Sequence, residues 1–304
     1  MDREHVPVMV HEVIGLLGCG PHQVYVDATL GGGGHSVEIL KQTSPDGQVI
    51  GIEWDEEAIA RAREVLAPFG DRVRIVRENF VRLPALFKEM KIWSVDGILL
   101  DLCLSSIQLG GRQRGFSFKA DAPLDMRMDQ RSEETAADLV NQLSLDELEE
   151  TLWKYGEERW AKRIAKAIGE ERSRRPIETT QALGRIIYRA IPRRFQSRRI
   201  DPATRTFQAL RIRVNHELEN LKGVLEEGWP FVKRGGRMCV ISFHSLEDRM
   251  VKEAFRRCER GGEGDPDRKA VMRVITRKPV TPSEEEQRDN PRSRSAKLRC
   301  AERV

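Results

Sequence analysis

The feature that most constrains this chain is a run of four glycines behind a short apolar segment. Residues 24–26 (Val-Tyr-Val) predict a buried strand, Asp27 stands at its end, and the glycines at 31–34 follow. From Ser36 onward the apolar residues have helical spacing. A strand, a glycine turn and a helix start are typical of the phosphate- or nucleoside-binding corner of a doubly wound α/β fold. Glycine suits that corner because the backbone turns sharply and a ligand comes close.

A second acidic strand end indicates the class of ligand. Residues 49–53 (VIGIE) predict a strand that ends in Glu53, twenty positions beyond Gly33. A carboxylate at this place accepts hydrogen bonds from ribose hydroxyls, in NAD and in S-adenosylmethionine alike. The third glycine of the dinucleotide fingerprint is absent, because Ser36 occupies its position. That substitution disfavours an NAD-linked oxidoreductase, which stays open as an alternative.

Two further strands complete the predicted sheet edge. Residues 73–76 lead to Phe80, an aromatic that could pack on an adenine ring or simply belong to the core. Residues 95–101 (VDGILLD) lose the alternation of apolar and polar residues, as expected for a strand buried on both faces, and end in Asp101. Ligands of open parallel sheets bind at the carboxyl ends of the strands, so we expect the acids at these ends to line one site.

Beyond Asp101 the alternation of strands and helices stops. We expect an ordered loop over residues 105–129 and an inserted helical domain over residues 112–215. Ser144 and Thr179 are predicted helix caps, and one long helix is expected to carry the apolar residues from Phe207 to Leu225. This helical stretch indicates a second domain.

The sheet is expected to resume after the insertion. Residues 235–242, 272–276 and 298–301 predict the remaining strands, while 261–267 and 279–295 are predicted loops. Residues 1–111 and 216–304 would therefore form one discontinuous α/β domain.

The charge is distributed unevenly along the 304 residues. Residues 153–215 hold 17 lysines and arginines against 6 acidic residues, a net charge of +11, so the rest of a chain of net charge +4 carries −7. A basic block on an otherwise acidic protein indicates a polyanionic partner. A surface of solvated arginines is the plainer interpretation, but aromatic residues and proline turns inside the block favour a folded domain that faces nucleic acid.

Other sequence features point to the cytoplasm. The five cysteines are scattered without a C-x-x-C pair, which predicts reduced thiols and no metal site. The acidic N-terminal segment, interrupted by Pro7, is unlike a signal peptide, and no apolar run reaches the length of a membrane span.

Several separated stretches resemble one family, the bacterial small-subunit ribosomal RNA cytosine-N4 methyltransferases of the MraW or RsmH type. The order and spacing of the stretches match the family from near the N-terminus to the last strand. One departure is Cys103, where the family usually has a small, glycine-like residue. The matching stretches are HVPVMVHEV (5–13), DATLGGGGHS (27–36), ILLDLCLSSIQL (98–109), RGFSF (114–118), PLDMRMD (123–129), ATRTFQALRIRVNHEL (203–218) and ISFHSLEDR (241–249).

The resemblance implies a Rossmann-like, class I S-adenosylmethionine-dependent methyltransferase with an inserted all-helical domain. Glu53 would bind the ribose and Phe80 the adenine, and the glycine turn with Asp101 and Gln108 would hold the methionine end of the cofactor. The implied cofactor contacts are Gly33, Gly34, His35, Glu53, Phe80, Asp101 and Gln108.

The implied substrate is a cytosine of 16S ribosomal RNA in the small (30S) subunit or its precursor, methylated on its exocyclic N4 amine. Asp101 is a candidate proton acceptor, and Phe243 and His244 are candidates to contact the extruded base. Arginines of the insertion would neutralise RNA phosphates: Arg193, Arg194, Arg198, Arg199 and Arg205. A homodimer is left open.

Two further alternatives remain at this stage. A cytosine-C5 methyltransferase would use Cys103 as a nucleophile on the ring. A non-catalytic RNA-binding assembly protein would keep the cofactor fold without transferring a methyl group.

Overall fold

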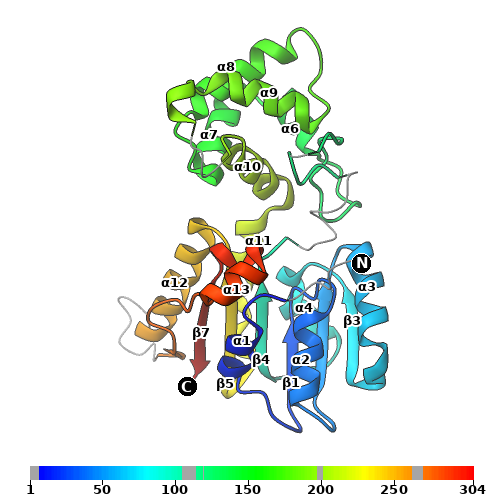
Figure 1. Cartoon of the computed structure of the whole chain (residues 1–304). Helices are drawn as coiled ribbons and strands as arrows, with labels where there is room; N and C mark the ends of the chain where they lie inside the picture. Colours follow the sequence, from blue (N-terminus) through cyan, green and yellow to red (C-terminus); the bar gives the residue numbers. More distant parts are fainter. Residues whose placement is uncertain (1–6, 105–113, 119, 197–200, 262–269) are drawn as a thin grey trace. The chain divides into compact units, whose positions relative to one another are not determined.

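The structure is a computed structural model that describes residues 7–104, 114–118, 120–196, 201–261 and 270–304 (Figure 1). The chain divides into two compact units. One comprises Met1–Ser105 with Leu218–Val304, and the other comprises Ser106–Glu217. The sequence-based boundaries of the insertion, 112 and 215, compare with 106 and 217 in this division.

The first unit contains a seven-stranded sheet in the order β3-β2-β1-β4-β5-β7-β6. Strands β1 to β5 run parallel, and β7 lies antiparallel between β5 and β6. This arrangement confirms the predicted doubly wound α/β class. The strands are β1 Val24–Asp27, β2 Gln48–Glu53, β3 Val73–Arg77, β4 Val95–Asp101, β5 Val232–Ser242, β6 Met272–Val274 and β7 Lys297–Arg303.

The strand register brings the three acidic strand ends to one edge of the sheet. Asp27 at the end of β1 lies opposite Gly51 of β2 and Leu99 of β4. Glu53 and Asp101 each lie two residues further along their own strands, in the same direction. Because β1, β2 and β4 are parallel neighbours, their carboxyl ends meet at one place.

Both faces of the sheet are covered, which explains the apolar runs in its strands. Ile98 and Leu100 of β4 belong to one buried cluster with Phe87 and Leu221, and Leu99 belongs to the opposite cluster with Leu66. The helices of this unit are α1 Val10–Leu17, α2 Gly34–Gln42, α3 Glu56–Leu66, α4 Leu83–Glu89, α11 Glu217–Glu227, α12 Ser245–Arg260 and α13 Glu284–Asp289, with the first residue of α11 assigned to the second unit.

The second unit is helical in the part that the structure describes. Both predicted helix caps are confirmed: Ser144 forms a capping box with Glu147, and the Thr179 side chain accepts a hydrogen bond from the backbone N–H of Ala182. The helices are α6 Ala136–Gln142, α7 Leu145–Gly156, α8 Ala161–Arg172, α9 Thr180–Ala190 and α10 Thr204–Asn215.

The prediction of a single long helix from Phe207 to Leu225 is wrong, because the structure has two helices there. Helix α10 ends at Asn215, His216 adopts a left-handed conformation (φ 51°), and α11 starts at the next residue. The Asn215 side chain accepts a hydrogen bond from Met128 N (2.7 Å) and donates one to Met126 O (2.8 Å). These contacts with a segment 87 and 89 residues away are tertiary, so helical periodicity alone could not have revealed the break.

Other elements differ from the expectation as well. Residues 279–295 are not only loop, because they contain α13 and the 3-10 turn Pro291–Ser295. Helices α6 and α12 were not predicted from the sequence. Among the described residues, no helix is both long and apolar enough to cross a membrane.

Candidate cofactor and active site

The glycine turn has backbone conformations that residues with a side chain rarely adopt. Gly31 and Gly33 have positive φ angles of 51° and 85°. A Cβ placed on Gly33 would also lie 3.1 Å from the Leu66 side chain. Gly33 immediately precedes α2, so the turn directs the first backbone N–H groups of that helix to the strand edge.

Glu53 ties this turn to the end of β2. Its Oε1 accepts hydrogen bonds from the backbone N–H groups of Trp54 and Asp55, both at 2.9 Å, and its Oε2 accepts one from Gly31 N at 2.9 Å. A carboxylate has about four acceptor positions, so Oε2 retains one for a ribose hydroxyl. Burial raises the pKa of Glu53 to about 7, against the opposing effect of these backbone donors.

Asp27 is buried between the strand end and the first turn of α2. Only 1% of the residue is exposed, and its Oδ2 accepts a hydrogen bond from Ser36 Oγ at 2.7 Å. Burial raises the pKa of Asp27, while the charge of His35 and the Ser36 hydrogen bond lower it. Its position makes Asp27 a support for the turn.

Asp101 and His35 face each other at the end of β4. His35 Nε2 lies 2.8 Å from the carbonyl oxygen of Val8, which can only accept, so Nε2 carries a proton. His35 Nδ1 lies 3.7 Å from Asp101 Oδ2. Asp101 Oδ1 accepts a hydrogen bond from Cys103 N (3.2 Å), which leaves Oδ2 as the carboxylate oxygen available to a ligand or a proton.

The pKa of Asp101 is raised to about 6, mainly by burial. The charge of His35 and the Cys103 N–H lower it, whereas the carboxylates of Asp27 and Glu247 raise it further. Near neutral pH this carboxyl group is therefore ionised but close to its titration point, as suits a group that binds a cation or exchanges a proton.

Of the remaining predicted cofactor residues, the structure describes Phe80 and Gly34 but not Gln108. Phe80 opens the 3-10 turn Phe80–Arg82 after β3 and is half-buried against the sheet core, so it has both core contacts and an exposed part. Gly34 is the first residue of α2. Gln108 lies outside the described residues.

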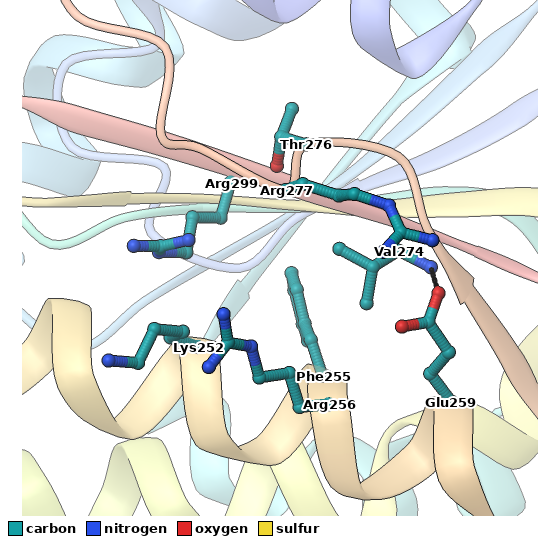
Figure 2. Close-up of a pocket in the computed structure, with 8 residues that line it drawn as sticks. All are labelled: Lys252, Phe255, Arg256, Glu259, Val274, Thr276, Arg277 and Arg299. Atoms are coloured by element: carbon teal, nitrogen blue, oxygen red, sulfur yellow. Dashed lines mark hydrogen bonds between the residues drawn. The ribbon is translucent and has the colours of Figure 1, made fainter.

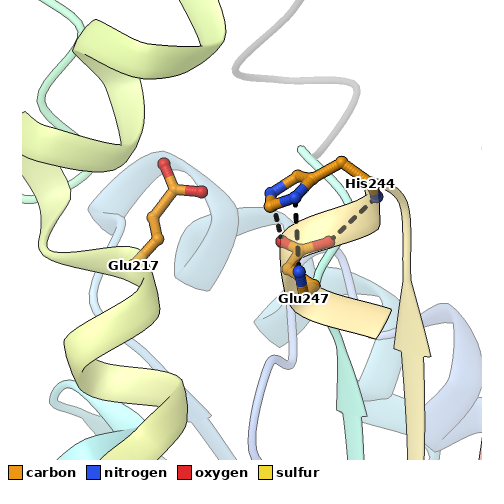
Figure 3. A group of neighbouring side chains, drawn as sticks. All are labelled: Glu217, His244 and Glu247. Carbon is orange, nitrogen blue, oxygen red and sulfur yellow. Dashed lines mark hydrogen bonds and ion pairs between the residues drawn. The ribbon is translucent and has the colours of Figure 1, made fainter. Parts of the chain in front are cut away.

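His244 caps helix α12 and is paired with a residue that sequence analysis missed. Glu247, 3% exposed, accepts hydrogen bonds through Oε2 from Phe243 N (2.8 Å) and His244 N (3.3 Å). His244 Nδ1 in turn accepts one from Glu247 N at 3.4 Å (Figure 3). A glutamate three residues after a polar residue is the usual signal of such a capping box, but histidine in place of serine or threonine concealed it.

One histidine nitrogen is left over by this arrangement. His244 Nε2 is buried and lies 3.1 Å from Glu247 Oε1, yet it has no aligned hydrogen bond within the described residues. Phe243, half-buried, packs against a core cluster of the sheet.

The predicted RNA-binding arginines lie in the second unit. Arg193 and Arg194 belong to the exposed 3-10 turn Arg193–Phe195, and the Arg194 guanidinium carbon is 4.8 Å from the centre of the Phe195 ring. Arg205 Nη1 donates a hydrogen bond to Glu157 O at 2.8 Å. Arg198 and Arg199 lie outside the described residues.

Beside these arginines the second unit has a hollow of about 380 Å³. Trp160 and Phe195 contribute aromatic rings whose centroids are 5.1 Å apart, and Phe195 is 53% exposed. The carboxylates in its wall are engaged within the protein, because Glu158 accepts from Trp160 N and Asp201 accepts from Tyr188 Oη. Arg159 and Arg205 also line the hollow, so its wall combines aromatic rings with charged groups of both signs.

Comparison with known proteins identifies the family of the chain. A protein of Geotalea uraniireducens called ribosomal RNA small subunit methyltransferase H is 52% identical over 310 residues, covering 100% of this chain and 99% of the relative. A protein of the same name from Clostridioides difficile is 46% identical over 311 residues, with complete coverage of both chains. A putative rRNA methylase structure from Clostridium thermocellum aligns over 97% of this chain and 95% of its own, at 12% identity and a TM-score of 0.46, too low to add to the argument.

The sheet, with antiparallel β7 between β5 and β6, is that of a class I S-adenosylmethionine-dependent methyltransferase. The family description that matches residues 2–304 is that of the MraW methylases. With the acidic strand ends, the glycine turn and close relatives along the whole length, the chain belongs to the MraW methylase family.

Proposed function

We propose that this protein transfers the methyl group of S-adenosylmethionine to the exocyclic N4 amine of a cytosine in small-subunit ribosomal RNA. The observation that carries the proposal is the strand-end site of Glu53, Asp101 and the glycine turn, in a chain that matches the MraW methylase family over residues 2–304. Relatives of about 50% identity are called small-subunit ribosomal RNA methyltransferases.

The site residues suit the chemical groups of this cofactor. Glu53 offers its remaining acceptor position to a ribose hydroxyl, and the exposed part of Phe80 offers a surface for the adenine. The ionised Asp101 carboxylate stabilises the positive charge at the methionine end. S-adenosylmethionine itself supplies an activated methyl group on a sulfonium.

The reaction requires the protein mainly to position the cytosine amine and to provide a proton acceptor. The lone pair of the cytosine amine is delocalised into the ring, so the nitrogen must be aligned with the methyl group and must lose a proton as the new bond forms. Asp101 Oδ2, on a carboxyl group with a pKa of about 6, is our candidate acceptor. His244 Nε2, with no aligned partner among the described residues, is a candidate donor to the extruded base.

A C5 methyltransferase mechanism is not favoured. That chemistry needs a thiolate nucleophile, whereas the Cys103 thiol donates a hydrogen bond to Leu104 O at 3.3 Å. This contact favours the protonated thiol. The family to which the chain belongs points the same way.

We assign RNA docking to the helical unit, with the 30S subunit or its precursor as the partner. Its exposed arginines supply charge for phosphates, and the hollow at Trp160 and Phe195 supplies ring surfaces for an unpaired base. An enzyme with this partner would act in the cytoplasm. A homodimer remains a prediction.

The phenylalanine of this hollow gives a direct test of RNA docking. Phe195→Ala is expected to weaken RNA binding about 5- to 150-fold, because stacking one base on an aromatic ring contributes roughly 1–3 kcal/mol. Fluorescence anisotropy with a labelled ribosomal RNA fragment measures the loss. Trp153→Ala is the matched control, since Trp153 is 63% exposed on α7 and does not line the hollow. Equal affinity of Phe195→Ala and wild type would contradict the docking assignment.

The activity itself is tested by methyl transfer and product analysis. Tritium from labelled S-adenosylmethionine is expected to enter small-subunit ribosomal RNA, and more readily in partly assembled subunits than in free cytidine. Mass spectrometry of digested RNA should place the label on cytosine N4. Label on cytosine C5, or no transfer to any ribosomal RNA preparation, would refute the proposed function.

A further inference from the structure

A small basic hollow lies on the α/β unit, between α12, β6 and β7 (Figure 2). Its volume is about 80 Å³, and four of its lining residues are cationic: Lys252, Arg256, Arg277 and Arg299. Phe255 stands among them. Glu259 is its single acidic lining residue.

Three of these cations have no acidic partner in the part of the chain that the structure describes. Among the described residues, no carboxylate lies within ion-pair distance of Lys252, Arg256 or Arg277. Their neighbours differ: Arg257 is paired with Glu226 at 3.5 Å, and Arg273 with Glu302 at 2.6 Å. Lys252, Arg256 and Arg277 thus bring three such cations to the lining of one hollow.

This grouping of like charges opposes folding unless an anion is present. Lys252 and Arg256 are four residues apart on one face of α12, a spacing at which like charges repel. Figure 2 shows both side chains on α12, with Arg299 of β7 above them in the view. A bound anion would turn this repulsion into attraction.

The frame of the hollow is fixed by internal contacts. The side chain of Arg299 is 6% exposed, and its Nε donates to Asp248 Oδ1 at 2.6 Å. Glu259 Oε1 accepts a hydrogen bond from Val274 N at 2.9 Å, and Thr276 Oγ1 accepts one from Cys300 N at 2.8 Å. The acidic group in the wall is therefore committed to the β6 backbone, and the cations surround a preformed space.

We infer that this hollow binds a backbone phosphate of the RNA substrate, outside the helical unit. Its size suits a tetrahedral anion, and arginine forks suit phosphate oxygens. Helix α12 starts directly after β5, whose carboxyl end belongs to the cofactor edge; Lys252 and Arg256 lie roughly 12 and 18 Å along the helix from His244. An RNA strand entering the site covers that span in a few nucleotides. The inference rests on the proposed function for the identity of the polyanion.

Salt dependence of RNA binding tests the contact. The triple variant Lys252→Gln, Arg256→Gln, Arg277→Gln keeps most of the side-chain length and removes the charge. We expect RNA affinity at low salt to fall roughly tenfold, and the slope of log affinity against log salt to lose about 0.7, the value for one phosphate contact on a single strand. The dissociation constant of S-adenosylmethionine should not change. Arg257→Gln, on the same helix, is the matched control.

The results separate this inference from the proposed function. An unchanged slope in the triple variant, or an equal change in Arg257→Gln, overturns the phosphate site even if wild type methylates RNA. If the salt slope of the triple variant differs from that of the wild type as expected, yet the wild type transfers no methyl group to RNA, the phosphate site stands and the proposed function fails. Thermal shift with inorganic phosphate tests whether the ligand is a free anion. If phosphate stabilises the wild type but not the triple variant, and the salt slope of RNA binding is the same in both proteins, the hollow binds free anions and the inference is overturned.

Discussion

Asp101→Asn is expected to lower kcat/KM for methyl transfer about 100-fold or more, while raising the melting temperature of the cofactor-free protein. The variant loses the negative charge beside the sulfonium and the candidate proton acceptor. Its amide preserves the local hydrogen bond, because the amide oxygen can still accept from Cys103 N. Steady-state kinetics and calorimetric titration with S-adenosylmethionine measure the loss.

The gain in stability follows from the pKa of about 6 at Asp101. The folded-state pKa exceeds the ordinary aspartate pKa of 3.8, so the folded protein holds more protons than the unfolded chain between these values. The resulting stabilisation is full below about pH 4 and is lost as pH rises through about 6, a cost on the order of 2–3 kcal/mol at pH 7.5. The asparagine variant avoids that cost.

The control is Asp96→Asn, on the same strand. Asp96 accepts hydrogen bonds from Val24 N (2.8 Å) and Lys233 Nζ near the start of β4, away from the cofactor edge. It should lose stability and keep its affinity for S-adenosylmethionine. An Asp101→Asn protein that transfers methyl groups at the wild-type rate would show that this carboxylate has no part in the reaction.

Glu53→Gln is expected to weaken S-adenosylmethionine binding about 30- to 100-fold, the effect of losing hydrogen bonds to a charged group. The amide oxygen can replace Oε1 towards Trp54 N and Asp55 N. The amide nitrogen then faces Gly31 N–H, donor against donor, and offers nothing to accept from a ribose hydroxyl. Isothermal titration calorimetry measures the change.

The matched control for Glu53 is Glu56→Gln on α3, whose exposed carboxylate pairs with Arg77 at 3.1 Å. Titration against pH adds a second test, since burial raises the pKa of Glu53 to about 7 and that of Asp101 to about 6. Wild-type affinity for S-adenosylmethionine should rise with pH through both values. Glu53→Gln should keep only the lower step and Asp101→Asn only the upper one. Two steps in both variants would refute these assignments.

The sequence was sufficient for elements whose signals are local. Apolar runs ending in Asp27, Glu53 and Asp101 predicted three strands and their order along the chain, and parallel pairing then required the acids to meet at one edge. Ser144 and Thr179 were correct as caps because their side chains bond to backbone groups three residues away.

The elements that were missed depend on distant contacts or on unusual capping residues. The break after Asn215 is made by bonds to Met126 and Met128. The start of α12 was hidden because His244 replaces the common capping residues. For the site, sequence placed the carboxylates but could not show that His35 Nε2 is fixed by Val8 O or that Glu53 binds Gly31 N, since both partners are backbone groups, which leave no pattern in a sequence.

Helix α11 completes the core of the α/β unit, although the helical unit interrupts that unit in the sequence. Leu221, Val224 and Leu225 of α11 share a buried cluster with Ile98 of β4 and Val240 of β5, and those strands are hydrogen-bonded neighbours. The connection between them is thus a complete crossover without the helical unit. The α/β unit is therefore modular: the helical insert could be exchanged or reshaped in evolution while the acidic strand ends and the glycine turn are inherited unchanged.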